Sequence, residues 1–499
     1  MKKQRILYFN DARHYYLFVH EPPMSLEEAW RPIDEIAGTS VNTFVYGVER
    51  GDGLFYPSRA GRMFEGSMLE TGGHEFTYEW RTVKNMQGLI DRGLDPLTVL
   101  IDRAHAKGME FIASLRMHSY LGLKDEHRVP TAEPWASNPS IAGSGLLFNG
   151  ADHSHKEVRE HNLAVAGELA RDYATDGVEL DFIFTAHSFP REEARDKLDV
   201  MTNLVEEISE TVRGRPGSPG ILGARVLPTE EMCLNAGHDV RDWLDKGLLD
   251  YVLPMTYDPF RLDCDPPIEW LVEAAQDTDT SVYGFLHPYY QSEGVRRFIE
   301  VQHATPAMVR AAAANNYKKG VDGLCAWFLK WPLGDDQRGL LTQIGDPDLL
   351  EESDKHYFLR WRSDTMATVG WDGQVPQPIE VGEKSSFTFE IADDPIGNAR
   401  RIRQLLLRIK LDNSARDDQI TYTLNGDSLN EEQVVSSYGG QIAPYQARWL
   451  EFRLRKVTPR QGLNELTISL DGRPDGLDGS ITVEDVELLV EYTPYPTEV

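Results

Sequence analysis

The stretch DGVELDFIF, residues 176–184, decides the fold of this chain. Its apolar, β-branched and aromatic residues predict a buried strand over Gly177–Phe184. Helical patterns occupy the segments on both sides, one ending near Tyr173 and the other covering Arg195–Arg213. A strand between two helices predicts a parallel βα unit, in which helices cover the faces of the sheet.

The same alternation of strand and helix extends over residues 1–350. Capping residues at Ser25, Asp95, Ser154 and Thr305 mark the expected helix starts. The expected strands are Ile6–Phe9, Ser40–Val48, Glu110–Leu115, Gly177–Phe184, Ile221–Leu227, Asp250–Met255, Ser281–Leu286 and Val321–Phe328. This order predicts a (β/α)8 TIM barrel with insertions. The alternative is a doubly wound open sheet, but the glycine-rich phosphate loop that such sheets often carry is not found.

The pattern changes after about residue 350. Helical periodicity gives way to short alternating segments, separated by turn residues such as Asn425-Gly426 and Asp471-Gly472. The expected strands are Ser386–Ile391, Gln404–Leu411, Thr421–Leu424, Trp449–Leu454, Asn464–Ser469 and Thr482–Tyr492. This series predicts an all-β, jelly-roll-like sandwich over residues 355–499, following a barrel over residues 1–350.

Charge and cysteine content argue against several classes of partner. The chain of 499 residues has a formal net charge of −29, which repels nucleic-acid phosphates and anionic lipids. No apolar run is long enough to span a bilayer, and the N-terminus lacks a signal-peptide pattern. Three scattered cysteines predict free thiols. We expect neither nucleic acid nor membrane as a partner, and the pattern leaves open the oligomeric state and whether the protein is cytoplasmic or secreted.

Glu179 and Asp181 are the strongest candidates for a functional site. Alternate residues of a strand point the same way, so both carboxylates are expected on the inner face of the barrel. Buried charges are costly unless they have partners or a function. The alternative is a structural ion pair with Arg116 or Arg225, whose strands end nearby.

Two carboxyl groups at the end of a barrel suggest glycosidic bond cleavage. That reaction needs an acid to protonate the leaving oxygen and a carboxylate that acts as nucleophile or as base for water. Asp181 is expected to be the negatively charged partner. The candidates for the proton donor are Glu231 and Glu230, in the loop after the fifth strand, and Asp258, after the sixth.

Further side chains near the strand ends are candidates for substrate binding. They are Glu179, Arg116, His118, His187, Arg225, Tyr257, His287, Trp327 and Trp331. Aromatic rings can stack on sugar faces, although packing in the core explains such residues equally well. We expect no cofactor and no metal; the alternative is a metal site formed by His118, His187 and Asp181.

Several motifs together resemble one known family. The matching stretches are Ser40–Ser58, Asp95–Gly108, His155–Arg159, Asp176–Asp181 and Trp243–Tyr257. In this order they are similar to five motifs of the glycosyl-hydrolase-like 10 family of TIM-barrel proteins. Those motifs lie in the second strand, in a helix, at the start of a helix, in the fourth strand and in the sixth strand. The family's usual strand-three end, H-A-W-x-N-P, is replaced by Ala113–His118, and Phe182 stands where a second aspartate often follows.

The resemblance implies hydrolysis of glycosidic bonds in an oligo- or polysaccharide. It places Asp181 at the active-site face of the barrel, with Tyr257 lining it, and the terminal sandwich resembles galactose-binding-like accessory domains. The principal hypothesis is therefore a two-carboxylate glycosidase that needs no cofactor. The alternatives are a non-catalytic glycan-binding protein on the same barrel and a metal-dependent hydrolase.

Overall fold

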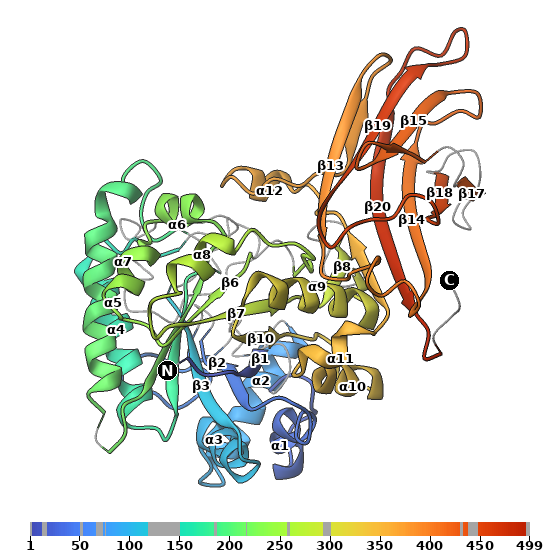
Figure 1. Cartoon of the computed structure of the whole chain (residues 1–499). Helices are drawn as coiled ribbons and strands as arrows, with labels where there is room; N and C mark the ends of the chain where they lie inside the picture. The colour runs from blue at the N-terminus through green and yellow to red at the C-terminus, as the bar shows by residue number, and fades with distance from the viewer. Residues whose placement is uncertain are drawn as a thin grey trace. The chain divides into compact units, whose positions relative to one another are not determined.

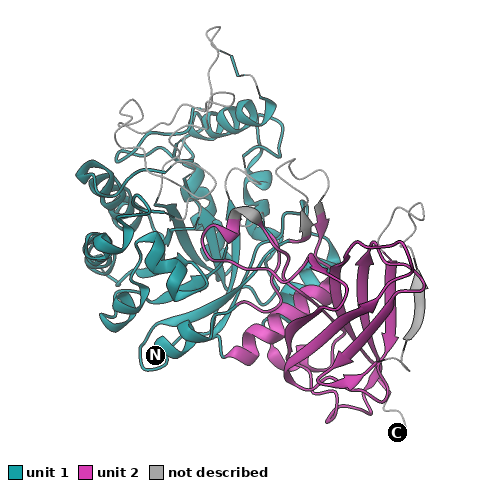
Figure 2. Ribbon diagram, turned by 90° about the horizontal axis from the view of Figure 1, so that it is seen from above, with its two compact units in different colours: residues 1–260, 267–288, 320–345 teal, residues 261–266, 289–319, 346–499 magenta. Residues whose placement is uncertain are grey.

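A computed structural model describes most of the chain. The described residues are 2–11, 17–49, 53–65, 73–74, 76–117, 150–183, 187–215, 217–256, 260–292, 301–429, 433–437 and 448–495. They form two compact units, coloured teal and magenta in Figure 2. Unit 1 comprises residues 1–260, 267–288 and 320–345, and unit 2 comprises residues 261–266, 289–319 and 346–499.

Unit 1 is built on a closed barrel of parallel strands (Figure 1). Around the barrel the order is β1-β10-β7-β6-β5-β4-β3-β2. The strands are β1 (Ile6–Asp11), β2 (Thr43–Gly47), β3 (Glu110–Arg116), β4 (Gly177–Asp181), β5 (Ile221–Val226), β6 (Tyr251–Pro254), β7 (Ser281–Leu286) and β10 (Gly323–Ala326). Each corresponds to an expected strand, so the TIM barrel is confirmed and the doubly wound sheet is excluded.

Helices lie outside the ring of strands, as α3, α4 and α5 show in Figure 1. Among the described residues of unit 1 the helices are α1 (Leu26–Asp34), α2 (Thr77–Ile90), α3 (Pro96–Ala106), α4 (Lys156–Arg171), η2 (Ala194–Lys197), α5 (Leu198–Arg213), α6 (Glu230–Ala236), α7 (Val240–Asp245), α8 (Glu269–Ala274) and α10 (Asp335–Gln343). None of the helices in the described ranges is both long and apolar enough to cross a membrane.

The capping predictions have mixed outcomes. Ser25 forms the expected capping box with Glu28, and the Asp95 side chain accepts hydrogen bonds from the first turn of α3. The prediction of a cap at Ser154 is wrong, because α4 begins at Lys156 and its N-cap residue is His155. The Ser154 hydroxyl instead accepts a hydrogen bond from another helix, donated by Lys197 Nζ at 2.6 Å.

Helix α2 is absent from the sequence-based prediction. The face that it buries includes Glu79, Thr82 and Asn85 beside Met86 and Leu89. A helix with polar residues at buried positions lacks the apolar stripe that reveals amphipathic helices in a sequence.

Two of the antiparallel sheets of unit 2 confirm the β-sandwich. In the first sheet the order is β11 (Lys355–Phe358), β20 (Ile481–Tyr492), β14 (Ile402–Asp412), β18 (Arg448–Arg453) and β17 (Gln433–Ser437), with β12 (Gln377–Ile379) also paired to β20. In the second it is β13 (Lys384–Ile391), β19 (Gly462–Gly472), β15 (Gln419–Leu424) and β16 (Asp427–Ser428). Alternate residues of β14 and β19 are buried, as the two-residue period requires.

Unit 2 also includes segments that precede the sandwich in the sequence. This part contains β8 (Tyr289–Ser292), β9 (Val301–His303) and α9 (Pro306–Lys319), and the short helices α11 (Pro347–Glu351) and α12 (Asp364–Ala367) follow. The β8–β9 ribbon and α9 therefore come from the connection between barrel strands β7 and β10 in the sequence.

Candidate active site

Glu179 is the centre of a buried polar cluster inside the barrel. Its side chain is fully inaccessible to solvent. Its Oε1 accepts hydrogen bonds from Arg225 Nε at 2.6 Å and from the Ser114 hydroxyl at 2.8 Å, and its Oε2 accepts one from the Tyr251 hydroxyl at 2.9 Å. Burial and the neighbouring Glu179 raise the pKa of Tyr251 well above its usual value, so the phenol keeps its proton and donates it.

The strand register explains why these side chains meet. Ser114, Glu179, Gly223 and Tyr251 occupy matching positions on β3, β4, β5 and β6. Gly223 leaves room for the neighbouring ring, since a Cβ atom there would lie 2.0 Å from Cζ of Tyr251. The glycine thus lets the Tyr251 hydroxyl reach across β5 to Glu179.

Arg225 connects Glu179 with the next layer of the barrel. Its guanidinium carbon lies 3.7 Å from the centre of the Phe9 ring on β1. Burial alone would lower the pKa of Arg225, but Glu179 and Asp181 outweigh burial and raise it, so the side chain stays charged. Nη2 of Arg225 is buried and has no hydrogen-bond partner within the described part of the chain, which is unusual for a buried polar atom.

Asp181 lies one layer above Glu179, at the C-terminal end of β4. Its register neighbours are Arg116 on β3 and Arg225 on β5. Oδ1 accepts the Ile183 backbone N–H at 3.0 Å, which fixes the orientation of the carboxylate. Oδ2 lies 3.9 Å from Arg225 Nη1, too far for a hydrogen bond. Asp181 is 6% exposed, so it is close to the surface of the cluster without being free in solvent.

A second ion pair, at the same end of the barrel, joins β1 and β3, the two neighbours of β2. Arg116 Nη2 donates to Asp11 Oδ2 at 2.6 Å, and both side chains are buried. Arg116 thus has its close ion pair with the last residue of β1, whereas the sequence suggested pairing with Glu179 or Asp181. Asp11 was missed in the sequence, although an acid two residues after the apolar run Ile6–Phe9 was the available signal.

His287 and Trp327 are buried in aromatic packing. Burial lowers the pKa of His287 to about 3, so the imidazole is neutral in ordinary buffers. Its ring centre lies 4.6 Å from that of Phe285. The Trp327 ring packs edge-on against Phe9 and Phe260, at 5.2 and 4.5 Å, and only 3% of the residue is exposed. Both ring nitrogens of His287 are buried without a hydrogen-bond partner among the described residues.

His187 lies in a separate group of buried histidines with His153 and His238. Burial lowers the pKa of His187 and of His153 to about 4, and that of His238 to about 3, so all three are neutral near pH 7. His238 Nε2 is 2.8 Å from the Ser188 hydroxyl, and His153 Nε2 is 3.0 Å from Asn162 Nδ2. These bonds orient the His238 and His153 rings.

The two proton-donor candidates on α6 are engaged with arginines. Glu230 accepts from Arg241 Nε at 2.7 Å and Glu231 from Arg195 Nη2 at 2.5 Å. These hydrogen bonds lower the pKa of both carboxyl groups. A general acid at neutral pH needs the opposite shift. The structure therefore brings Glu179, Asp181 and Arg225 together, but it places Glu230 and Glu231 in other ion pairs.

The remaining candidates differ in what the structure says of them. His118, Tyr257 and Asp258 lie outside the described residues. Trp331 is partly exposed, and its ring centre is 6.4 Å from that of Phe18.

Tyr251 and Ser114, which complete the Glu179 cluster, were missed in the sequence. Their strands are otherwise apolar, and such strands indicate packing in the core.

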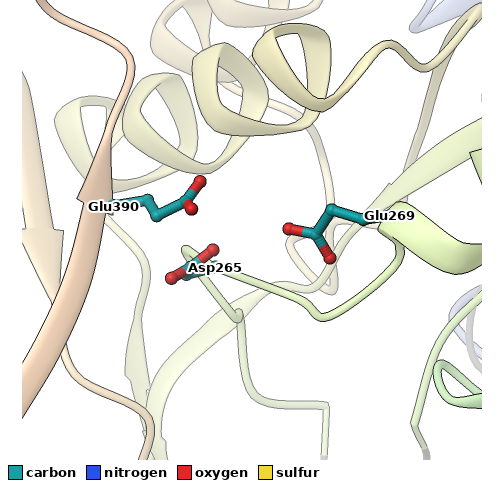
Figure 3. Close-up of side chains that lie close together, drawn as sticks. All are labelled: Asp265, Glu269 and Glu390. Atoms are coloured by element: carbon teal, nitrogen blue, oxygen red, sulfur yellow. The ribbon is translucent and has the colours of Figure 1, made fainter. Parts of the chain in front are cut away.

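In unit 2, Asp265 and Glu390 carry carboxylates that lie close together (Figure 3). Lys319 Nζ is 2.7 Å from Asp265 Oδ1 and 3.8 Å from Glu390 Oε2. The ammonium group supplies the positive charge that two neighbouring acids need. Asp265, Glu390 and Lys319 accordingly form an ion-pair network within unit 2.

Unit 1 is thus a TIM barrel with buried acids and arginines at the C-terminal ends of its strands. In sequence, the chain is similar to the Glycosyl hydrolase DigH of Escherichia coli (strain K12), with 26% identity over 235 residues. That alignment covers 38% of this chain and 53% of DigH, so the chain spans about half the length of the curated relatives it matches. The DigH proteins of Escherichia coli O157:H7 and Shigella flexneri match with the same figures.

No protein-family model matches the chain, so the resemblance to the glycosyl-hydrolase-like 10 family stays a prediction. Among solved structures, the glycoside hydrolase domain of PgaB (BpsB) from Bordetella bronchiseptica is 12% identical and aligns with 68% of this chain and 98% of its own, at a TM-score of 0.43. The Streptomyces plicatus β-hexosaminidase is 14% identical and aligns with 70% of this chain and 62% of its own, at a TM-score of 0.35.

Proposed function

We propose that this protein is a glycosidase that cleaves O-glycosidic bonds of an oligo- or polysaccharide with two carboxyl groups. Asp181 is the negatively charged partner, and it acts as nucleophile or as base for water. The observation that carries the proposal is the contrast between two acids on one strand. Both oxygens of Glu179 accept hydrogen bonds, whereas within the described part of the chain the nearest charged group to Oδ2 of Asp181 is Arg225 Nη1, at 3.9 Å. The sequence similarity to a glycosyl hydrolase supports it.

The neighbouring residues have positioning roles in this proposal. Glu179 fixes Arg225, and the Ile183 backbone N–H fixes one oxygen of Asp181. Asp181 is thereby held in one orientation before substrate binds, which lowers the entropic cost of reaching the transition state. Its negative charge stabilises the oxocarbenium-like character that develops on the sugar.

For the proton donor we propose Asp258. It follows the end of β6 by only a few residues, and catalytic groups of TIM barrels come from these loops. Glu230 and Glu231 are poorer candidates because their arginine partners lower the pKa values of both carboxyl groups.

The test is release of reducing sugar from a panel of polysaccharides. Asp181→Asn and Asp258→Asn should each reduce turnover by about a hundredfold or more, because each removes one of the two required carboxyl groups. Glu231→Gln is the matched control and should stay within about twofold of the unmodified protein, since loss of a surface acid does not touch the reaction.

Wild-type turnover by Asp181→Asn would remove Asp181 from the mechanism. Binding of glycan without turnover, unaffected by Asp181→Asn, would instead support the non-catalytic alternative. Thermal unfolding of each variant shows whether a loss of turnover reflects a loss of folded protein.

A further inference from the structure

Four aromatic rings of unit 1 form a continuous row. The ring centres of Phe76 and Tyr78 are 5.7 Å apart and nearly parallel, with 21° between their planes. Phe18 is 6.4 Å from Tyr78 and also 6.4 Å from Trp331, and it meets both rings edge-on, with 72° and 83° between the planes. Phe76 is 39% exposed, and the other three are partly exposed. We call these four residues the aromatic row.

A buried asparagine holds the segment of the row that carries Phe18 against α2. Asn85 lies on α2, the helix that begins beside Phe76 and Tyr78. Its Nδ2 donates to the backbone oxygens of Leu17 and His20, at 2.7 and 2.8 Å, and its Oδ1 accepts the Met24 N–H at 3.1 Å. These bonds fix the segment that carries Phe18 against the helix. The polar buried face of α2 thus positions an exposed aromatic surface.

The chain places the row on one side of the barrel mouth. Phe18 follows β1, Phe76 and Tyr78 follow β2, and Trp331 follows β10. These three strands are neighbours in the order β10-β1-β2, whereas β4 with Asp181 lies on the far side of the ring. Eight strands spaced by about 4.8 Å and tilted by about 36° make a barrel about 15 Å across.

Resting on the glycosidase function proposed above, we propose that the aromatic row is a carbohydrate subsite that stacks on pyranose rings of an extended polysaccharide. Flat aromatic faces pack against the C–H faces of sugars, and a row of them suits a ligand with repeated rings. Exposed aromatic side chains that a buried hydrogen-bond network holds in place indicate a binding surface. A chain that reaches Asp181 from this row must span several sugar units, which makes a polymer the substrate class.

Affinity electrophoresis of the full chain through gels that contain soluble polysaccharides tests the subsite. In the Asp181→Asn background, Phe76→Ala should weaken retention by the best ligand by about 5- to 20-fold, and Phe18→Ala should act in the same direction. Phe76→Tyr keeps the aromatic face and should restore retention. Tyr495→Ala removes an exposed aromatic residue of unit 2, 79% exposed, and should change nothing.

The same variants in the active protein separate the subsite from the chemistry. Phe76→Ala should raise KM for the polysaccharide and leave kcat for short oligosaccharides within twofold. Unchanged affinity and KM in both alanine variants, or no retention of the unsubstituted protein by any polysaccharide, would overturn the subsite. Retention that depends on Phe76 but comes without turnover would support the subsite and count against the proposed glycosidase.

Discussion

At the residue scale, the interior of the barrel contains a charged cluster where apolar side chains are usual. Arg225 and Glu179 are both almost completely buried. A buried ion pair contributes little net stability, but removing one partner leaves an uncompensated charge and costs about 3–5 kcal/mol. The cluster is therefore better understood as a device that fixes the Arg225 side chain 3.9 Å from Asp181 than as a source of stability.

Gly223→Ala should disrupt this cluster without changing any charge. The new Cβ atom would lie 2.0 Å from a ring atom of Tyr251, which is fully buried and cannot move aside freely. We expect a loss of about 1–3 kcal/mol in the free energy of unfolding, measured by urea denaturation. Because the Tyr251 hydroxyl would no longer donate its hydrogen bond to Glu179, turnover should also fall.

Gly88→Ala is the matched control. Gly88 lies inside α2, and nothing lies within 4 Å of a Cβ atom built there. Alanine in the interior of a helix should add up to about 1 kcal/mol of stability. If Gly223→Ala were as stable as this control, Gly223 would not be needed to admit the Tyr251 ring.

Only part of this cluster could be predicted from the sequence. The rest depends on contacts between residues that are far apart in the chain. The inward direction of Glu179 and Asp181 follows from the two-residue period of a single strand. The Asp11–Arg116 pair joins β1 to β3 across 105 positions of sequence, so no local pattern reveals it. The Tyr251 hydroxyl was equally hidden, because its role depends on a glycine in the neighbouring strand.

At the element scale, strand β20 carries two buried acids that share one partner. Asp485 and Glu487 point to the same side, and the Tyr290 hydroxyl of β8 contacts both carboxyl groups. A phenol has only one proton to donate, so the second contact requires a proton on a carboxyl group. Arg408 and His356 lie beside Glu487 and favour its charged form, which leaves the proton on Asp485.

The stability of the protein should therefore depend on pH through Asp485. Burial, reinforced by Glu487, raises the pKa of Asp485 to about 8 in the folded state, whereas the unfolded chain releases this proton near pH 4. Between these values the folded state binds the additional proton. The free energy of unfolding should fall as the pH rises from about 4 to 8, by up to about 1.4 kcal/mol per pH unit from this group, and then level off.

Urea denaturation at pH 5, 6, 7 and 8 measures this dependence. Asp485→Asn keeps a donor for Tyr290 and has no titrating proton, so its stability should decline less steeply than that of the unmodified protein. Glu491→Gln changes a partly exposed acid of the same strand, which pairs with Arg403, and should leave the slope as it was. Parallel curves for Asp485→Asn and the unmodified protein would show that Asp485 is already ionised at pH 5.

At the scale of the whole molecule, the two folds were easier to predict than the division of the chain between them. The change from helical to alternating patterns near residue 350 predicts where the sandwich strands begin. It does not reveal that α9 and the β8–β9 ribbon belong to unit 2. Long-range hydrogen bonds make that connection: Asn315 Nδ2 donates to the backbone oxygens of Cys264 and Glu390, both at 2.9 Å.

A chain that ends at residue 350 should for this reason fold poorly. It would keep α9 but lose the oxygen of Glu390 that Asn315 binds and the oxygen of Asp354 that Arg310 binds. A buried polar group left without its partner costs about 1–3 kcal/mol, and the apolar side chains that α9 buries would add to the loss. We expect this fragment to aggregate or to melt at least about 8 °C below the full chain in circular dichroism.

Asn315→Ala in the full chain removes only the hydrogen bonds of this side chain. It should lower the melting temperature by only a part of that difference. A fragment as stable as the full chain would mean that α9 is held by the barrel and that residues 1–350 fold as an independent domain.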